Sequence, residues 1–450
     1  MIPKTPKNEL SDLPTALFHS AGVRLAKARR VRVAVIGAGI IGITTAYELA
    51  ADGHEVTVFE RRSAAAEETS FANAGVVAPG YVTPWAAPGM PGKVLGHLFS
   101  RHAPIKLALP LSGAELSWMW KWYRACKLGT YLANRARLQR LAFYSRERLH
   151  QLTAGLQLEY DRSSGYMVLL RSEKDSRMIQ PGLQVLRDAG VAFREINEDE
   201  VRKIEPAINT DTSFFGGIHL PDDEVANCRQ FALLLKNEAQ KLGVKFEFNT
   251  AVAEVNPTHA ATVLIAGEAS PRSFDSVVMC AGLASAQLLK PLGLKIPMVA
   301  VYGYSISAPI REPLNAPRSA LMDEHYKVAI SRLGNRVRVA GSAEIGGSLD
   351  RKRAASIQTL YKVLHDWFPG AAQHSNLGAH VQEWKGARPM LPDGPPIIGN
   401  SGVPGLWLNL GHGSSGWALS CGSARVLADV MAGRSADIDM EGLGIARLGL

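Results

Sequence analysis

The stretch from Val35 to Gly42 reads VIGAGIIG and has the glycine spacing of a dinucleotide-binding turn. Gly37 permits a tight turn, Gly39 lets the backbone approach a pyrophosphate without an intervening Cβ, and Gly42 allows a helix to pack closely on a strand. The helix expected to begin near Ile40 would turn its free N–H groups and its positive dipole end toward the phosphates. We therefore predict a bound dinucleotide, in preference to a glycine-rich turn without a ligand.

An acidic residue follows at the distance that the ribose of such a ligand requires. Glu60 lies about 20 residues beyond the glycines, where a carboxylate accepts hydrogen bonds from the adenosine ribose hydroxyls. A carboxylate also disfavours a 2′-phosphate on that ribose, although Arg61 and Arg62 follow directly. At this point FAD and NAD both fit the pattern.

Strands and helices must hold these residues in place. The β-branched run from Val31 to Ile36 enters the glycine turn, a helix follows, and a second β-rich run ends at Glu60, which together predict a βαβ unit. A Gly-Asn turn joins two alternating runs between Tyr326 and Gly341 and predicts a hairpin. Further strand-like runs span residues 165–171, 244–255, 274–282 and 298–307.

Loops and helices separate these runs. The Pro- and Gly-rich stretch from Pro79 to Gly92 predicts a long loop. From Gly113 to Leu152 the pattern is helical. Its apolar stripe is predicted to pack in the core and consists of Leu116, Met119, Trp120 and Tyr123.

The composition narrows the class of protein. A chain of 450 residues that is 46% hydrophobic and 20% charged is ordinary globular material, long enough for two domains. The net charge of +9 suits nucleic acid, an anionic membrane or acidic ligands, but the basic residues are spread out, so we expect no nucleic-acid partner. No apolar run reaches the roughly 18 residues that a membrane span needs. Four widely spaced cysteines indicate reduced apolar residues of a cytosolic protein rather than disulfides or a metal site, and they are Cys126, Cys228, Cys280 and Cys421.

Later segments can be interpreted as further contacts with one extended cofactor. The segment ETSFANAG, which ends at Gly75, permits close backbone approach and offers two polar side chains, although a capped polar loop is the alternative. A second loop-to-helix junction near Gly413 would place a positive dipole end at the N1/C2=O side of an isoalloxazine ring. NAD enzymes usually do not use a segment near the end of the chain to contact the cofactor. A second cofactor contact near Gly413 therefore favours FAD. The predicted cofactor contacts are Gly37, Gly39, Ile40, Gly42, Glu60, Arg61, Ser70, Asn73, Gly75, Val252, Ala281, Gly282, Gly411, Gly413, Ser414 and Gly416.

Four segments together resemble a known family of flavoenzymes. They are VAVIGAGIIGITTAYELAADGHEVTVFER, the loop containing PWAAPG, GARPMLPDGPPIIG and LWLNLGHGSSGW. This chain resembles the FAD-dependent D-amino acid dehydrogenases of the small-subunit type, within the D-amino acid oxidase, glycine oxidase and sarcosine oxidase group, from about Val31 to Gly433. The resemblance implies oxidation of a D-amino acid to the imino acid, which is hydrolysed to the 2-oxo acid and ammonia.

The expected fold class is α/β, with a Rossmann-like FAD-binding domain interleaved with a substrate domain. The substrate domain is expected to contain a mainly antiparallel sheet flanked by helices. We assign residues 31–98, 218–290 and 384–440 to the FAD-binding domain and residues 99–217 and 291–383 to the substrate domain, after an N-terminal extension of residues 1–30. The extension lacks the apolar region and cleavage site of a signal peptide.

Three residues are candidates for the catalytic site. Arg388 matches the arginine that similar enzymes use for the substrate carboxylate, which a guanidinium binds bidentately, while a structural arginine in a turn is the alternative. Tyr326 is similar in position to an active-site tyrosine of these enzymes that contacts the same carboxylate. The alternative is an ordinary tyrosine of a strand. His412 lies in the flavin-side loop, where it could form a hydrogen bond with the flavin ring or the substrate, and a structural histidine is the alternative. A Ser-His-Asp triad of Ser414, His412 and Asp393 is disfavoured because no nucleophile elbow surrounds the serine.

The resemblance also implies an electron acceptor, a quinone or another respiratory carrier rather than mainly oxygen. The segment from Lys93 to Leu107 mixes Leu95, Leu98 and Phe99 with basic residues and predicts a peripheral membrane contact, with a helix packed on the protein as the alternative. The expected location is cytoplasmic, at the inner face of the cytoplasmic membrane if this segment binds lipid.

Three other functions stay open. The nearest is a glycine, sarcosine or D-hydroxyproline oxidase or dehydrogenase of the same group, because the sequence does not give the pocket volume. The others are a non-catalytic FAD-binding subunit and an NAD(P)-dependent dehydrogenase.

Overall fold

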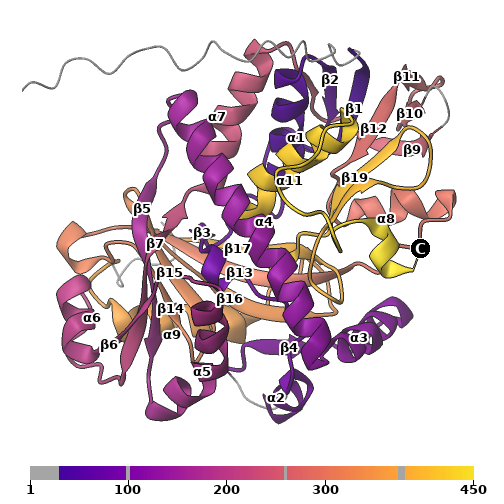
Figure 1. The fold of residues 1–450 in the computed structure, drawn as a ribbon. Helices are drawn as coiled ribbons and strands as arrows, with labels where there is room; N and C mark the ends of the chain where they lie inside the picture. The colour runs from indigo at the N-terminus through magenta and orange to yellow at the C-terminus, as the bar shows by residue number, and fades with distance from the viewer. Residues whose placement is uncertain (1–29, 98–101, 258–260, 373–380, 450) are drawn as a thin grey trace, which may run out of the picture.

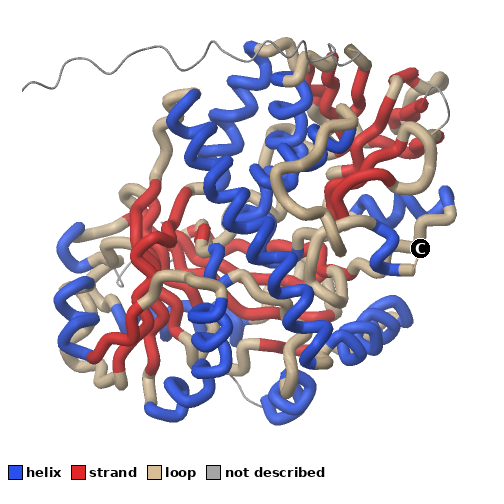
Figure 2. The backbone as a smooth tube through the Cα atoms, viewed as in Figure 1, coloured by secondary structure: helices blue, strands red, loops and turns tan. Residues whose placement is uncertain are grey.

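Two β-sheets form the framework of the molecule. The computed structural model describes residues 30–97, 102–257, 261–372 and 381–449. One sheet lies in the upper half of Figure 1 with helices α1, α7 and α11, and a larger sheet lies in the lower half. Figure 2 shows the same separation of the strands into two groups, with the long helix α4 (Leu128–Gly155) extending past both. The predicted extension 1–30 falls outside the described residues except for Arg30.

The first sheet has six strands and begins with the predicted βαβ unit. Its order is β18 (Ile397–Asn400), β19 (Leu406–Leu410), β12 (Ser276–Met279), β1 (Arg32–Ile36), β2 (Glu55–Phe59) and β8 (Lys245–Glu247). All neighbours are parallel except β18 and β19. Since parallel strands are buried on both faces, their continuous apolar sequence follows from this position.

The two faces of this sheet bury alternate residues of β1. Val33 and Val35 face a core made with α1 (Ile40–Ala51), α4, α7 (Cys228–Lys241) and α11 (Gly416–Met431). Ala34 and Ile36 face a second core, made with the three-stranded sheet β9 (Val252–Asn256), β10 (Ala261–Ile265) and β11 (Arg272–Phe274) and with α8 (Ala284–Leu289). The alternation fixes the register, because a slip of one residue would exchange the two faces.

The second sheet has ten strands and is mainly antiparallel. Its order is β17 (Gln382–Met390), β13 (Val299–Pro309), β16 (Arg336–Ile345), β15 (Val328–Leu333), β14 (Ala320–Asp323), β5 (Arg162–Leu170), β7 (Gly216–Ala226) and β3 (Val76–Val77), with β4 (Ile105–Leu107) on β16 and β6 (Arg194–Asn197) on β7. Its flanking helices are α2 (Met90–His97), α3 (Gly113–Ala125), α5 (Glu173–Asp188), α6 (Glu198–Ile204) and α9 (Ala354–Trp367). The predicted fold class is confirmed. The exact division into two interleaved domains stays a prediction.

Two predicted elements are wrong. The strand-like run 244–255 is not one strand: it contributes the parallel strand β8 to the first sheet and then turns at Asn249, whose φ is +54°, into β9 of the antiparallel three-stranded sheet. The N–H groups of Asn249 and Thr250 donate to the carbonyls of Arg62 and Glu60, so the chain binds back to the segment after β2 before β9 begins. The hairpin prediction, in contrast, is confirmed by β15 and β16, which Gly334 and Asn335 connect.

The apolar stripe of the predicted helix 113–152 is also misplaced. Leu116, Trp120 and Tyr123 are 56%, 61% and 55% exposed, whereas Trp118 and Trp122 on the other side of α3 are buried. The Nε1 atom of Trp118 donates to the carbonyl oxygen of Met390 at 2.9 Å, and this contact selects the buried side of the helix. The helical region also divides into α3 and α4 between residues 125 and 128. Helical periodicity was present on both sides of α3, so it could not identify the core side.

Among the described residues, no helix is both long enough and apolar enough to cross a membrane. The four cysteines are free thiols, with Cys126 half-buried and the other three buried.

Candidate active site

One large cavity lies between the two sheets. Its volume is about 1370 Å³, and its walls come from the β1–α1 turn, the segments after β2, the ten-stranded sheet and the β19–α11 junction. Small-molecule sites usually measure roughly 300–1,000 Å³. The cavity therefore has room for a dinucleotide together with a small substrate.

The glycine turn has the shape that a pyrophosphate needs. Gly37 has a φ of +103°, and a Cβ there would lie 2.8 Å from the carbonyl oxygen of Cys280. A Cβ on Gly42 would lie 1.9 Å from the carbonyl oxygen of Gly37, so this glycine is required for helix packing. At Gly39 the φ is −71° and a Cβ would meet only Ser70 Oγ, at 3.5 Å. The fold itself therefore leaves room for a side chain at Gly39, and this open space adjoins the N-terminus of α1, where a phosphate would bind.

Glu60 and Ser70 organise this turn from the cavity wall. The carboxylate of Glu60 accepts hydrogen bonds from the N–H groups of Ala38 (2.7 Å) and Arg62 (2.8 Å). Ser70 Oγ accepts from the N–H of Ile40 at 3.0 Å, so its own hydrogen is left to donate to a phosphate. Each oxygen of Glu60 retains a further lone pair for ribose hydroxyls.

The loop that contains Ser70 is held by side chains of the ten-stranded sheet. Ser305 Oγ donates to the carbonyl of Ala72 (2.8 Å), a guanidinium nitrogen of Arg338 to that of Asn73 (3.0 Å) and Ser331 Oγ to that of Ala74 (2.7 Å). In a planar trans peptide the N–H points opposite to the preceding carbonyl. The N–H groups of Asn73 and Ala74 are therefore directed away from the sheet, and both residues line the cavity.

Arg338 brings a positive charge beneath this loop. Its guanidinium is buried and donates to Ser307 Oγ at 2.9 Å as well as to Asn73. Burial lowers the pKa of Arg338 to about 10, so the side chain stays protonated at neutral pH. A fixed cation near a flavin favours the reduced form, on which negative charge accumulates.

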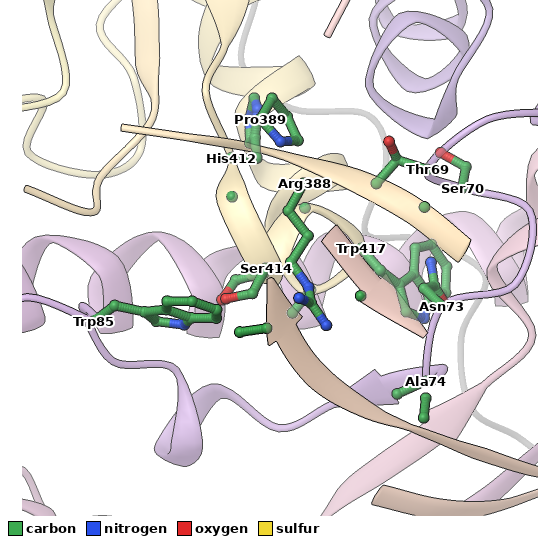
Figure 3. Close-up of a pocket in the computed structure, with 18 of the residues that line it drawn as sticks. Thr69, Ser70, Asn73, Ala74, Trp85, Arg388, Pro389, His412, Ser414 and Trp417 are labelled. Atoms are coloured by element: carbon green, nitrogen blue, oxygen red, sulfur yellow. The ribbon is translucent and has the colours of Figure 1, made fainter. Parts of the chain in front are cut away.

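Arg388 is a cation of the cavity wall that has no acidic partner in the described part of the chain. It lies on β17, donates one guanidinium hydrogen bond to the carbonyl of Ser342 (3.1 Å) and has its Cζ 5.8 Å from the centre of the Trp85 ring. Among the described residues, no carboxylate lies within ion-pair distance of it. Burial lowers the pKa of Arg388 to about 10, which keeps it charged at neutral pH. Figure 3 shows its guanidinium extending from the strand between Trp85 and Asn73. An unpaired guanidinium in a cavity is suited to bind a small anion such as a carboxylate.

His412 is buried and neutral. Ser423 Oγ donates to the carbonyl of Leu419 (2.7 Å) and therefore accepts from His412 at 2.9 Å, which places the imidazole hydrogen on Nε2. Burial lowers the pKa of His412 to about 3. Asp393 binds Arg447 at 2.7 Å instead of His412, which agrees with the rejection of a Ser-His-Asp triad.

Tyr326 lines the same cavity and packs against the ring of His325, an apolar core cluster and two cations. The Cζ of Arg171 lies 5.0 Å from its ring centre and the Nζ of Lys362 lies 5.6 Å from it. Its backbone N–H donates to Asp323 at 3.2 Å. These contacts describe a residue fixed in the wall, and none of them involves Arg388.

The structure brings nearly all predicted site residues together. Each predicted cofactor contact except Gly42 lines the cavity, as do Arg388, Tyr326 and His412. Arg61 is partly engaged elsewhere, because it pairs with Glu68 at 2.6 Å. Residues that the sequence did not single out also line the site or hold its parts, and they are Thr69, Trp85, Gly303, Ser305, Ser331, Arg338, Ser342 and Trp417. The strand residues of this set carry no sequence signal for such a role, whereas Thr69, Trp85 and Trp417 lie in segments that the sequence analysis quoted without naming these residues.

Comparisons with known proteins show the family to which the chain belongs. Residues 32–430 match the family described as FAD dependent oxidoreductase. The D-amino acid dehydrogenase of Bradyrhizobium diazoefficiens is 40% identical over 93% of this chain and 99% of that protein, and the D-amino acid dehydrogenase of Cereibacter sphaeroides is 42% identical over 93% of this chain and 95% of that protein.

Solved structures share the fold at lower identity. The glycine oxidase of Geobacillus kaustophilus has a TM-score of 0.69 and 21% identity, with 93% of this chain and 99% of that chain covered. The iminodiacetate oxidase of Chelativorans has a TM-score of 0.68 and 22% identity, with 92% and 98% covered. At these identities the structures bear on the fold alone.

Proposed function

This chain belongs to the family of FAD-dependent oxidoreductases, and on that basis we propose that it is an enzyme that oxidises D-amino acids. FAD is its cofactor. The product is the imino acid, which water hydrolyses to the 2-oxo acid and ammonia. The observation that carries the proposal is the guanidinium of Arg388, which has no carboxylate partner among the described residues and lies in the same cavity as the dinucleotide turn.

The described residues fit FAD along the length of the cavity. The open space at Gly39, the hydroxyl of Ser70 and the N-terminus of α1 would bind the pyrophosphate, and Glu60 would bind the ribose. The N–H groups of Asn73 and Ala74 offer donors to the ring system. When bound, FAD supplies an acceptor for the hydride that leaves the Cα of the amino acid.

The protein's own part in the reaction is to position the substrate. Arg388 would bind the α-carboxylate in two parallel hydrogen bonds, which orients the Cα–H toward the cofactor. Apolar side chains of Trp85, Met90, Val94 and Ile105 share one cluster and line the cavity, so they would exclude water from the reacting centre. We retain Tyr326 and His412 as proposed members of the site. Their contacts support a role in shaping the cavity wall better than a direct role in the reaction.

We expect D-amino acids to bleach the flavin of the purified protein under anaerobic conditions. The visible absorption of oxidised FAD should disappear on addition of a D-amino acid and persist with its L-enantiomer, because the relatives at 40–42% identity are named D-amino acid dehydrogenases. A panel with glycine, sarcosine and D-hydroxyproline separates the related amine oxidases. A yellow protein that no amine reduces would contradict the proposal and favour a non-catalytic FAD-binding subunit.

We further propose that the electrons pass to a quinone or another respiratory carrier at a membrane surface. Of the predicted contact segment 93–107, residues 98–101, with Leu98, Phe99 and Arg101, lie outside the described residues. Val94, Ile105 and Leu107 pack against an apolar cluster of the protein, as the alternative interpretation expects. Lys93 is exposed and Val94 lines the cavity, so this segment adjoins the site.

Helix α3 offers a second set of contacts on the same side of the molecule. Trp120 and Tyr123 are exposed and stack with their ring centres 5.8 Å apart, and Leu116 lies one turn before Trp120. The buried side of α3 packs with α2 in one apolar cluster, and the two helices are neighbours in Figure 1. Aromatic residues on an exposed helix face are typical of membrane interfaces.

The charges beside this face favour an anionic bilayer as its partner. Lys121, Arg124 and Lys127 are all exposed on α3 or directly after it. The one acidic residue of the helix, Glu115, binds the backbone N–H of Ser112 at 2.7 Å in a capping box. Basic residues next to an anionic leaflet contribute about 1 kcal/mol each.

The double variant Trp120→Ser/Tyr123→Ser is expected to lose binding to phosphatidylglycerol vesicles in a flotation assay. Removal of the two rings takes away the apolar area that would enter the interface, while flavin content and turnover with a soluble dye should stay unchanged. Phe215→Ser is the matched control, because Phe215 is an exposed aromatic outside α3. Equal vesicle binding by the double variant would contradict a contact through α3, and equal binding to phosphatidylcholine would contradict the role of the charges.

A further inference from the structure

Gly303 lies directly beneath the guanidinium of Arg388. On β13 and β17, Val301 is paired with Arg388 and Gly303 with Gly386, so the Arg388 side chain extends diagonally across the sheet to reach Gly303. A Cβ on Gly303 would lie 2.3 Å, 2.5 Å and 2.8 Å from Nη2, Cζ and Nη1 of Arg388. All three nearest neighbours of that Cβ would thus be guanidinium atoms.

A β-bulge on the next strand completes the contact. Tyr302 is paired with Glu344 and Tyr304 with Gly341, so Gly303 faces two residues of β16 instead of one. One of the two, Ser342, has a φ of +57°, which is rare for a residue other than glycine. Its carbonyl accepts the hydrogen bond from Arg388 at 3.1 Å. Bulges often redirect groups next to active sites, and this one directs a carbonyl at the guanidinium.

We infer that Gly303, together with the bulge at Ser342, positions Arg388 for the substrate carboxylate. This inference rests on the proposed function, in which Arg388 binds that carboxylate. A methyl group on Gly303 would have to displace the guanidinium by about 1 Å to restore ordinary contact distances. A misplacement of about 1 Å can cost roughly 100-fold in rate. Gly303 is therefore a positioning residue that acts through Arg388.

The contacts of a Cβ on Gly303 also show whether this glycine is needed to position Arg388 or to form the fold. A Cβ on Gly42 or Gly216 would collide with backbone atoms, at 1.9 Å and 2.4 Å, which cannot move without a shift of the strand or helix. At Gly303 the nearest atoms are the far end of a flexible side chain. The backbone of β13 can therefore stay in place when the guanidinium moves.

The test is a double-mutant cycle of Gly303→Ala and Arg388→Ala. We expect Gly303→Ala to raise KM for the best D-amino acid by about 10- to 100-fold. It should raise by a similar factor the Kd of the matching 2-oxo acid, measured from the change in the flavin spectrum. Flavin content and melting temperature should stay at the wild-type values. In the Arg388→Ala background the same substitution should change neither KM nor Kd, because the group that it displaces is gone.

The control variant is Gly155→Ala at the end of α4, where a Cβ would meet nothing within 4 Å. An effect of Gly303→Ala that persists without Arg388 would overturn the positioning role, as would wild-type Kd and KM in the single variant. If Gly303→Ala alone does not fold, the double variant with Arg388→Ala is expected to fold and bind FAD. If the double variant also fails to fold, Gly303 is needed for the structure of β13 and not for the position of Arg388. Unchanged KM in Arg388→Ala would instead contradict the proposed carboxylate site.

Discussion

Arg388→Ala is expected to raise KM for D-amino acids by at least about 100-fold while FAD stays bound. Two charge-assisted hydrogen bonds to a carboxylate contribute about 1.5–3 kcal/mol each, and each 1.4 kcal/mol corresponds to tenfold in affinity. FAD should be retained because the described contacts of Arg388 are with Ser342, Trp85 and Gly303, none of which belongs to the predicted cofactor contacts. Steady-state kinetics and the absorption spectrum of the purified variant measure the two effects separately.

Two further variants make this result specific. Arg388→Lys keeps the charge but loses the planar fork, so it should recover only part of the affinity. Arg332→Ala removes an arginine of the same sheet that donates to the backbone carbonyls of Pro313 and Pro317, and it should leave KM unchanged. Wild-type KM in Arg388→Ala would rule out the carboxylate contact, and a variant without flavin would indicate that Arg388 serves the cofactor.

Most of the predicted cofactor contacts that line the cavity lie within single short segments of the chain. The turn from Gly37 to Gly42 combines a strand, a tight turn and a helix N-terminus, and its physical requirements are written in adjacent residues. The position of Glu60 follows from the regular spacing of a βαβ unit. The junction near Gly413 was predicted for the same local reason, and the structure has η5 (Gly413–Ser415) followed by α11 there.

The parts that the sequence missed depend on which strands become neighbours. Gly303, Ser342 and Arg388 meet because β13 lies between β16 and β17, and the bulge that turns the carbonyl of Ser342 arises only from that pairing. The three side chains that hold the loop at Asn73 likewise come from β13, β15 and β16. Apart from Arg388, which lies in the segment GARPMLPDGPPIIG, none of these residues forms a motif with its own neighbours in the chain.

The error at α3 has a related cause. Trp118 and Trp122 occupy one side of the helix, and Trp120 and Tyr123 another, so apolar residues are present all round it. The buried side is chosen by the hydrogen bond from Trp118 to Met390, a residue more than 250 positions away. The exposed side, with Trp120 and Tyr123, is now the proposed membrane contact. The prediction that these residues pack in the core did not allow for such a role.

Gly39→Ala is expected to remove most of the bound FAD without loss of fold, whereas Gly42→Ala should damage the fold itself. The backbone at Gly39 suits any residue and a methyl group would only touch Ser70 Oγ at 3.5 Å, so the flavin-free protein should keep its melting temperature. The same methyl group would occupy the space where a phosphate approaches the N–H groups of α1. Loss of one such charge-assisted hydrogen bond costs about 1.5–3 kcal/mol, so the Kd of FAD should rise by about 10- to 100-fold.

The paired glycine provides the control for this result. A methyl group on Gly42 would lie 1.9 Å from the carbonyl oxygen of Gly37 and would force α1 away from β1, which lowers the melting temperature of the flavin-free protein as well. Titration with FAD and thermal unfolding of the flavin-free variants distinguish the two effects. Wild-type affinity in Gly39→Ala would mean that the pyrophosphate does not approach this turn. Equal destabilisation by both substitutions would mean that Gly39, like Gly42, serves the packing of the helix rather than the cofactor.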